Sequence, residues 1–232
     1  MIYFNGIALE NVAPVKVEDI RVSPISLNVT ARQRPIEYGA QFVRIGGGSR
    51  TVQITFALLE QSRPDRLNYL QFITDWARSD KEGELVLPDK QGVYLSCICT
   101  GLPEPSMRQW WESKLRLTFT AFDNPFWTAS AERHIACGTA FSVAGSAPPL
   151  MYIYKNRTSS GSNQSYSDGT NTMTFSTVPS GKMYIDLNKQ TAAVGTTSIM
   201  QYLSFSSSFI PPVTGIQTIT GNGDVYWRER WQ

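Results

Sequence analysis

The sequence predicts a mainly β protein of two domains: an N-terminal β-sandwich or barrel-like domain that carries one helix, and a C-terminal β-sandwich domain. Apolar and polar residues alternate in several runs of the first half, which is typical of half-buried strands. One segment, 62–80, has apolar residues at helical spacing instead. After Ser130, charged residues become sparse, and Ser, Thr, Gly and Asn surround short strand patterns, which favours a second, all-β domain.

The strands expected in the first domain carry apolar side chains on one face and polar side chains on the other. In one run Thr51, Gln53 and Thr55 stand between the apolar residues, and we expect them to face outward. The apolar positions of the runs are Val15 and Val17; Val52, Ile54, Phe56 and Leu58; and Leu115, Leu117, Phe119 and Ala121. Half-buried antiparallel strands fit this pattern.

The segment SRPDRLNYLQFITDWARSD, 62–80, is expected to form the helix. Ser62 and Asp65 resemble a capping box, and Pro64 falls in the first turn, where its missing N–H is harmless. The apolar residues fall within one broad arc of the helix surface: Tyr69, Leu70, Phe72, Ile73, Trp76 and Ala77. We expect this arc to pack on a sheet.

Short strands separated by turn signals are expected in the second domain. They lie at 151–154, 172–175, 183–187 and 202–205. A terminal hairpin is expected to turn at Asn222-Gly223, where the positive φ angles of a tight turn are available, before Val225-Tyr226-Trp227. This spacing of strands and turns favours a β-sandwich.

The boundary between the domains is predicted from the stretch DNPFW. Asp123-Asn124-Pro125 ends a strand, because Asp and Asn bond local backbone and Pro fixes φ. Phe126 and Trp127 then need a packing partner, and we expect them to fill the seam between two domains, with an ordinary turn around buried aromatics as the alternative. The domains are therefore placed at 1–130 and 131–232. A chain of 232 residues, 41% of them hydrophobic, can form two such cores.

No catalytic, cofactor or metal site is predicted. His134 is the only histidine, so a nucleophile such as the nearby Cys137 has a single candidate base, in a linker-like segment. Cys97 and Cys99 share a strand face with Leu95 and are expected to be small buried residues with free thiols. One histidine and three cysteines at these spacings do not match a zinc site.

The charge pattern predicts neither nucleic-acid nor membrane binding. The net charge is +2, from 21 basic and 19 acidic residues spread along the chain. The start, MIYFNGIALENVAP, lacks the features of a signal peptide, and no run of about 18 apolar residues predicts a membrane span. We expect a soluble protein that is made in the cytoplasm.

The segment from Asn28 to Arg50 is expected to form a long hairpin that projects beyond the core. Arg and aromatic side chains, which are enriched in protein interfaces, gather there: Arg32, Arg34, Tyr38, Phe42 and Arg44. Gly46-Gly47-Gly48 lacks the Lys and Ser or Thr of a phosphate loop and is interpreted as a mobile hairpin tip between strands at 41–45 and 50–59. The hairpin is either a solvated loop or an arm that reaches a neighbouring subunit, and in the second case these five residues form the interface.

Several short motifs, in their order along the chain, resemble the distal tail protein family of siphoviruses, the long-tailed, non-contractile bacteriophages. They are YFNGIALENV, RTVQITFALL, DRLNYLQFITDWARS, GELVLPDKQGVYLSCIC and KLRLTFTAFDNPFWTA, followed by APPLMYIYKN, GKMYIDLNKQT and VYWRERW. KLRLTFTAFDNPFWTA is similar to the strand, acidic residue, Pro and aromatic that close the family's first domain. The second domain departs from the family in being short and Ser-rich.

The resemblance implies a non-enzymatic virion protein of the tail tip, assembled in the host cytoplasm and without cofactors. Its N-terminal domain would form a homo-oligomeric ring, hexameric in the family, that joins the tail tube protein to the tail-associated hub or fibre protein. Its C-terminal domain would be galectin-like and would offer a platform for receptor-binding or baseplate proteins.

A carbohydrate-binding protein that acts through the second domain is the alternative hypothesis. Sugar sites combine an exposed aromatic ring with Asn, Asp, Glu or Arg side chains that bind hydroxyl groups. The candidate rings are Tyr152, Tyr154, Tyr166 and Trp227. Binding to a glycan panel would distinguish this function from ring assembly, which electron microscopy of the purified protein would detect.

Overall fold

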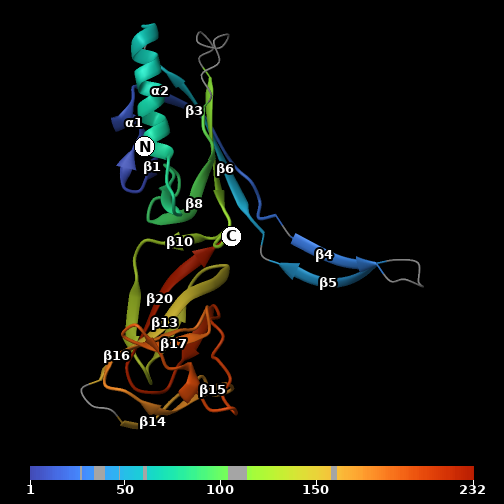
Figure 1. Ribbon diagram of the computed structural model, residues 1–232, viewed down its shortest axis with the longest axis vertical. Coiled ribbons are helices and arrows are strands. Elements are labelled where there is room, and N and C mark those ends of the chain that lie inside the picture. The colour runs from blue at the N-terminus through green and yellow to red at the C-terminus, as the bar shows by residue number, and fades with distance from the viewer. Residues whose placement is uncertain (27, 34–39, 47, 60–61, 104–113, 158–160) are drawn as a thin grey trace. The chain divides into compact units, whose positions relative to one another are not determined.

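The computed structural model describes residues 1–26, 28–33, 40–46, 48–59, 62–103, 114–157 and 161–232. The chain divides into two compact units, Met1–Trp127 and Thr128–Gln232. Strands dominate the described part of both units, and the longest described helix lies in the first unit (Figure 1). Among the described residues, no helix is long and apolar enough to span a lipid bilayer.

Unit 1 is built on antiparallel strands in the order β2-β1-β7-β8-β9-β6-β3. These strands are β1 (Tyr3–Phe4), β2 (Ile7–Ala8), β3 (Val15–Val22), β6 (Arg50–Leu58), β7 (Gly83–Val86), β8 (Val93–Gly101) and β9 (Leu115–Ala121). Strand β8 belongs to two ladders, because Leu95–Cys97 pair with β7 and the residues from Ile98 onward pair with β9. The predicted alternation is observed in β6: Val52, Ile54 and Phe56 are buried.

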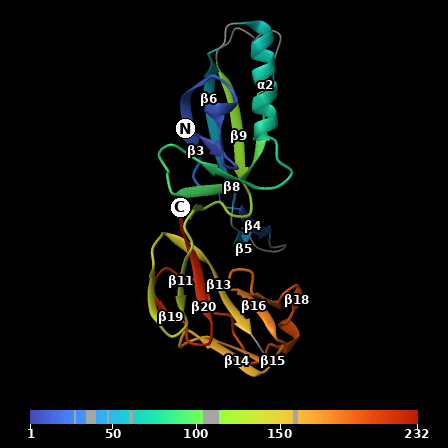
Figure 2. The ribbon, with the colours of Figure 1, turned by 90° about the vertical axis from the view of Figure 1, so that its left-hand side faces the viewer.

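Helix α2 (Arg63–Ala77) lies beside this sheet (Figure 2). Ile73 and Ala77 are buried, and Trp76 is half-buried. The indole N–H of Trp76 donates a hydrogen bond of 3.0 Å to the backbone oxygen of Ile7, and its ring meets Phe4 edge-on. This helix therefore packs on the sheet as predicted.

Two details of the predicted helix are wrong. Phe72 is 52% exposed, so the buried arc is narrower than the six apolar residues suggested. Ser62 is the N-cap residue, but its side chain makes no capping hydrogen bond, and Pro64 at the second helical position has no N–H to offer it. A four-residue helix, α1 (Leu9–Val12), precedes α2 and was not predicted.

Strands β4 (Asn28–Gln33) and β5 (Ala40–Gly46) form the predicted hairpin. They pair antiparallel from Asn28 opposite Gly46 to Gln33 opposite Ala40, with a register shift between Thr30 and Ala31. They make up a two-stranded sheet of their own (Figure 1). Strand β5 ends at Gly46 and pairs with β4, whereas β6 pairs with β3 and β9, so the predicted hairpin tip between 41–45 and 50–59 is wrong.

Unit 2 contains a sheet in the order β18-β17-β16-β13-β20-β11 and two short strand pairs, β12-β19 and β14-β15 (Figure 2). The strands are β11 (Arg133–Ala136), β12 (Ala140–Val143), β13 (Ala147–Arg157), β14 (Gly161–Ser167), β15 (Thr172–Val178), β16 (Gly181–Asp186), β17 (Thr191–Val194), β18 (Thr197–Ser198), β19 (Gly215–Thr218) and β20 (Asp224–Trp231). Strand β10 (Trp127–Ala129) spans the boundary between the units.

Two expectations for unit 2 are wrong. Segment 202–205 is not a strand; a 3-10 helix, η1 (Met200–Tyr202), stands at its start. The terminal hairpin is absent from the described residues, because β20 pairs with β13 and β11 and its predecessor β19 pairs with β12. Gly223 does adopt a positive φ, 133°, where the chain enters β20.

The core of unit 2 gathers side chains from the six-stranded sheet and from both strand pairs. On β13 Met151 and Ile153 point inward, and on β20 Val225 and Trp227 do the same. The members are Phe141, Val143, Met151, Ile153, Tyr166, Met173, Phe175, Val178, Met183, Ile185, Leu187, Ala192, Ile199, Ile210, Ile219, Val225 and Trp227. Elements on both sides of one core form a β-sandwich, so the predicted mainly β class is confirmed.

Candidate functional site

The predicted subunit interface falls on the β4–β5 hairpin. Arg32 lies on β4, and Phe42 and Arg44 lie on β5, within neighbouring rungs of one ladder: Thr30 pairs with Arg44, Ala31 with Phe42 and Arg32 with Gln41. The other two predicted residues, Arg34 and Tyr38, lie outside the described residues. The structure thus brings three of the five together along the hairpin, and their role in an interface stays a prediction.

The root of the hairpin is a clamp of backbone and serine groups. The N–H of Ser26 donates to the Ser49 oxygen, and the N–H of Ser49 donates to Ser26 Oγ, both at 3.0 Å. The N–H of Thr51 donates to Ser23 Oγ at 2.8 Å. A Cβ on Gly48 would overlap the backbone oxygen of Ser26, so only glycine fits there. The chain is therefore fixed where it enters and where it leaves the hairpin.

Arg50 follows this clamp at the start of β6 and is only 5% exposed. Its Nε and Nη1 atoms find no hydrogen-bond partner among the described residues. Burial lowers the pKa of its guanidinium. A buried cation without an acceptor is costly to the fold.

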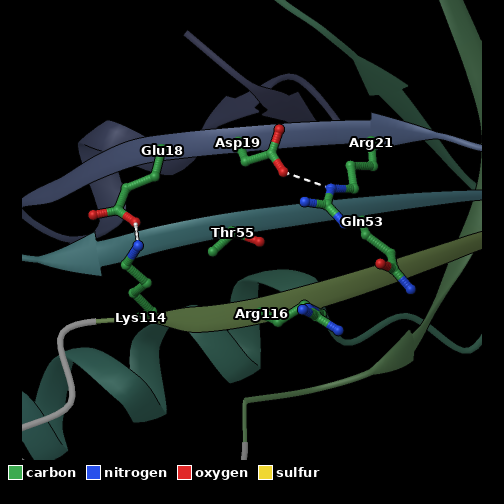
Figure 3. A pocket seen from close by; sticks show the side chains of 7 residues that line it. All are labelled: Glu18, Asp19, Arg21, Gln53, Thr55, Lys114 and Arg116. Atoms are coloured by element: carbon green, nitrogen blue, oxygen red, sulfur yellow. Dashed lines mark hydrogen bonds and ion pairs between the residues drawn. The ribbon is translucent and has the colours of Figure 1, made fainter.

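The outer face of strands β3, β6 and β9 holds a polar hollow (Figure 3). Lys114 Nζ lies 3.1 Å from Glu18 Oε2, and Arg21 Nε lies 2.6 Å from Asp19 Oδ2. The other lining residues are Gln53, Thr55 and Arg116. The outward position of Gln53 and Thr55 agrees with the sequence prediction. Exposed ion pairs of this kind add little to the stability of the fold.

Both aromatic residues of the predicted seam are shielded from solvent, Trp127 more completely than Phe126. Trp127 is 2% exposed and is the last residue of unit 1, and Lys90 Nζ lies 5.4 Å from the centre of its ring. Phe126 is half-buried. Their place between two domains stays a prediction.

The thiols are poorly suited to nucleophilic chemistry. Burial raises the pKa of Cys97 and of Cys99, and it raises the pKa of Cys137 to about 11 with a further contribution from the charge of Asp224. They are therefore protonated at neutral pH. His134 is exposed and stacks on Tyr226, with ring centres 5.1 Å apart. The described residues contain no group of three or more His, Cys, Asp or Glu that could hold a metal ion.

An aromatic ladder runs across four neighbouring strands on the outer face of the unit 2 sheet. Its rings are His134 on β11, Tyr226 on β20, Tyr152 on β13 and Tyr184 on β16. Tyr152 and Tyr226 stack at 4.9 Å with planes 2° apart, and Tyr152 meets Tyr184 at 4.7 Å. Tyr154 adds an edge contact with Tyr226 at 6.2 Å.

A charged pair fixes the middle of the ladder. The Tyr152 hydroxyl donates to Glu132 Oε2 at 3.1 Å, and Arg228 Nε lies 3.5 Å from Glu132 Oε1. Burial, then the hydrogen bond and the charge of Glu132, raise the pKa of Tyr152 to about 12. Burial also raises the pKa of Tyr184. Both phenols are therefore neutral donors at physiological pH.

The structure divides the four rings proposed for sugar binding into two pairs. Tyr166 is 1% exposed and its hydroxyl donates to the Asn222 oxygen at 2.9 Å, while Trp227 packs on Phe141 in the core. Neither can meet a ligand, so their selection is wrong. Tyr152 and Tyr154 do lie on the outer face. The ladder was missed, although MYIYK, KMYID and VYW each place tyrosine out of phase with the buried residues.

No protein-family model matches the sequence, and no curated protein matches it. Among solved structures, the Dit (gp19.1) protein of phage SPP1, described as a paradigm of the hub adsorption apparatus in phages that infect Gram-positive bacteria, matches with a TM-score of 0.73 at 14% identity. The match covers 100% of this chain and 98% of the SPP1 chain. The chain has the fold of SPP1 Dit.

Two structures of the phage p2 baseplate in its activated conformation, with Sr and with Ca, also match. Their TM-scores are 0.43 and 0.41 at 11% and 12% identity, and they cover 92% of this chain and 89% and 90% of the p2 chains. Scores of this size do not assign a fold. The match to SPP1 Dit over nearly the full length of both chains confirms, for the fold, the resemblance to siphovirus distal tail proteins.

Proposed function

We propose that the protein is a structural component of a siphovirus tail tip, a distal tail protein that belongs to a hub adsorption apparatus like that of SPP1 Dit. The observation that carries the proposal is the shared fold, which extends over 100% of this chain and 98% of the SPP1 chain. The role is structural, in keeping with thiols whose pKa values are raised. The protein would act in the virion, after assembly in the host cytoplasm.

Unit 1 is proposed to form a closed, hexameric ring in which each subunit gives its β4–β5 hairpin to a neighbour. The hairpin forms no ladder with the rest of unit 1 in the described residues, so its strand edges are open to another chain. Because hydrogen bonds between Ser26 and Ser49 hold its root, the hairpin can extend toward a neighbour without disturbing β6. In a cyclic assembly each subunit would bind the hairpin of one neighbour, so no hairpin would keep an unpaired strand edge.

The tail tube protein and the tail-associated hub or fibre protein are the proposed partners above and below the ring, with receptor-binding or baseplate proteins on unit 2.

Native mass spectrometry and negative-stain electron microscopy of the purified protein test the ring. We expect hexamers for the unaltered chain. Replacement of residues 30–44 by a short Gly-Ser turn keeps the Ser26–Ser49 clamp and is expected to give folded monomers. The matched control is the double substitution Lys114→Ala and Arg116→Ala on the polar hollow, which is expected to leave rings intact.

Two outcomes would contradict parts of the proposal. Rings that persist without the hairpin, but are lost in the Lys114 and Arg116 variant, would move the interface to the outer face of β3, β6 and β9. A chain that stays monomeric at every concentration, alone and with the tail tube protein, would contradict the tail-tip function itself.

A further inference from the structure

The aromatic ladder of unit 2 ends at Tyr184. Inside the ladder the rings cover one another: Tyr152 stacks on Tyr226 with planes 2° apart, and its tilt to Tyr184 is 35° at a centre distance of 4.7 Å. Tyr184 is 39% exposed. Its ring meets Tyr152 of β13 on one side, and its register partner on the other side is Ala193 of β17.

Small side chains lie beside Tyr184 on the next two strands of the sheet, β17 and β18. Ala193 on β17 is the register partner of Tyr184, and Ser198 on β18 is the partner of Ala193. Ala193 is half-buried and Ser198 is exposed. We call the place where the large Tyr184 ring stands beside these two small residues the step.

Polar groups of both kinds flank the step. Lys182 and Asp186 lie two residues on either side of Tyr184 in β16 and so share its face. Asp186 Oδ1 accepts the backbone N–H groups of Asn188 and Lys189 at 3.0 and 2.9 Å, which holds the carboxylate in place. One fixed acceptor and one flexible donor with opposite charges suit a neutral ligand that is rich in hydroxyl groups.

We propose that this step, formed by Tyr184, Ala193 and Ser198 between Lys182 and Asp186, binds one ring of a neutral saccharide. The C–H face of the sugar stacks on the open face of Tyr184, and its hydroxyl groups bond to the flanking charged side chains. The step is the place where the alternative function suggested by the sequence has a geometric basis. It lies wholly in unit 2 and does not depend on ring assembly.

Stabilisation of the sheet alone does not explain why an exposed tyrosine stands at the end of the ladder. Cross-strand aromatic pairs stabilise a sheet, which explains the rings that are covered on both sides. A tyrosine that faces Ala193 gains no such pair on that side. An acidic or basic partner surface would call for charges of one sign, whereas Lys182 and Asp186 balance.

The test is binding of the full chain to a glycan array of neutral oligosaccharides built from glucose, galactose, N-acetylglucosamine and rhamnose, with sialylated and phosphorylated glycans as a comparison. The best neutral glycan is then titrated by calorimetry. Tyr184→Ala is expected to weaken binding about tenfold or more, as the loss of a stacking contact requires. Ala193→Phe fills the step and is expected to abolish binding while Tyr184 is still present.

Phe205→Ala is the matched control, because it removes a fully exposed aromatic ring of the same unit, at a site on the chain segment that bonds to β15. It is expected to bind as the unaltered chain does. Thermal unfolding of each variant establishes that unit 2 is folded. The proposal is overturned if no neutral glycan binds, if only the anionic glycans bind, or if folded Tyr184→Ala and Ala193→Phe proteins bind normally. Loss of ring assembly in the hairpin variant leaves the glycan result unchanged, so the two proposals fail separately.

Discussion

Replacement of Trp76 by alanine tests how α2 is held on the sheet of unit 1. The indole makes one hydrogen bond, to the Ile7 oxygen, and edge contacts with Phe4 and Phe119 at 5.8 and 6.2 Å. A hydrogen bond contributes about 0.5–1.5 kcal/mol and an aromatic pair about the same. Because Trp76 is only half-buried, we expect a loss of about 3 kcal/mol, at the lower end of the range for a buried aromatic.

The assay is urea unfolding followed by far-UV circular dichroism. A loss of about 3 kcal/mol raises the unfolded fraction of unit 1 roughly 150-fold, yet a domain stability of about 5–15 kcal/mol leaves the unit folded in water. Trp76→Phe keeps most of the ring contact but loses the N–H, and it should cost about 1 kcal/mol.

Phe72→Ala is the matched control on the same helix. Phe72 is exposed and its ring meets Tyr69 edge-on, so its removal should cost no more than about 1 kcal/mol. Equal losses for Phe72→Ala and Trp76→Ala would refute the reasoning, because they would mean that the helix packs through a different face.

Three further predictions concern the hairpin root, the core and the ladder of unit 2. Gly48→Ala should open the root clamp, because its Cβ meets backbone, and faster hydrogen exchange of the Ser49 amide would report it. Tyr166→Phe should lower the free energy of unfolding of unit 2 by about 1 kcal/mol, since the backbone oxygen of Asn222 loses its hydrogen-bond donor. The folded-state pKa of Tyr152, about 12, lies above the ordinary tyrosine value of 10.0, so its contribution to stability is complete below pH 10 and is lost as pH rises through 12. Ultraviolet titration of the Glu132→Gln variant should find the pKa of Tyr152 lowered.

Local patterns in the sequence were sufficient for the elements whose periodicity is set by one buried face. Val52, Ile54 and Phe56 alternate with polar residues, and β6 follows this alternation because its apolar face packs into the core of unit 1. The helix was predicted for the same reason, from Ile73 and Ala77. The error at Phe72 arose because the spacing of residues on a helix defines an arc but not how wide the contact with the sheet is.

Pairing between distant strands could not be predicted from local patterns. The Asn222-Gly223 turn suggested a hairpin, yet β20 pairs with β13 and β11, whose sequences lie far from it along the chain. The ladder depends on the same long-range register, which sets His134 opposite Tyr226 and Tyr226 opposite Tyr152. The sequence pattern could show that each tyrosine faces outward, but it could not show which side chains on the adjacent strands lie next to it.

The clamp at the hairpin root has a consequence for how the chain can change over evolutionary time. The bonds between Ser26 and Ser49 close before β4 begins and after β5 ends, so they set the register of β3 against β6 whatever stands between them. Insertions, deletions and substitutions within 28–46 should therefore leave the pairing of β3 with β6 unchanged. Changes of length or sequence in the hairpin would therefore keep the architecture of unit 1, even where they alter what the hairpin contacts.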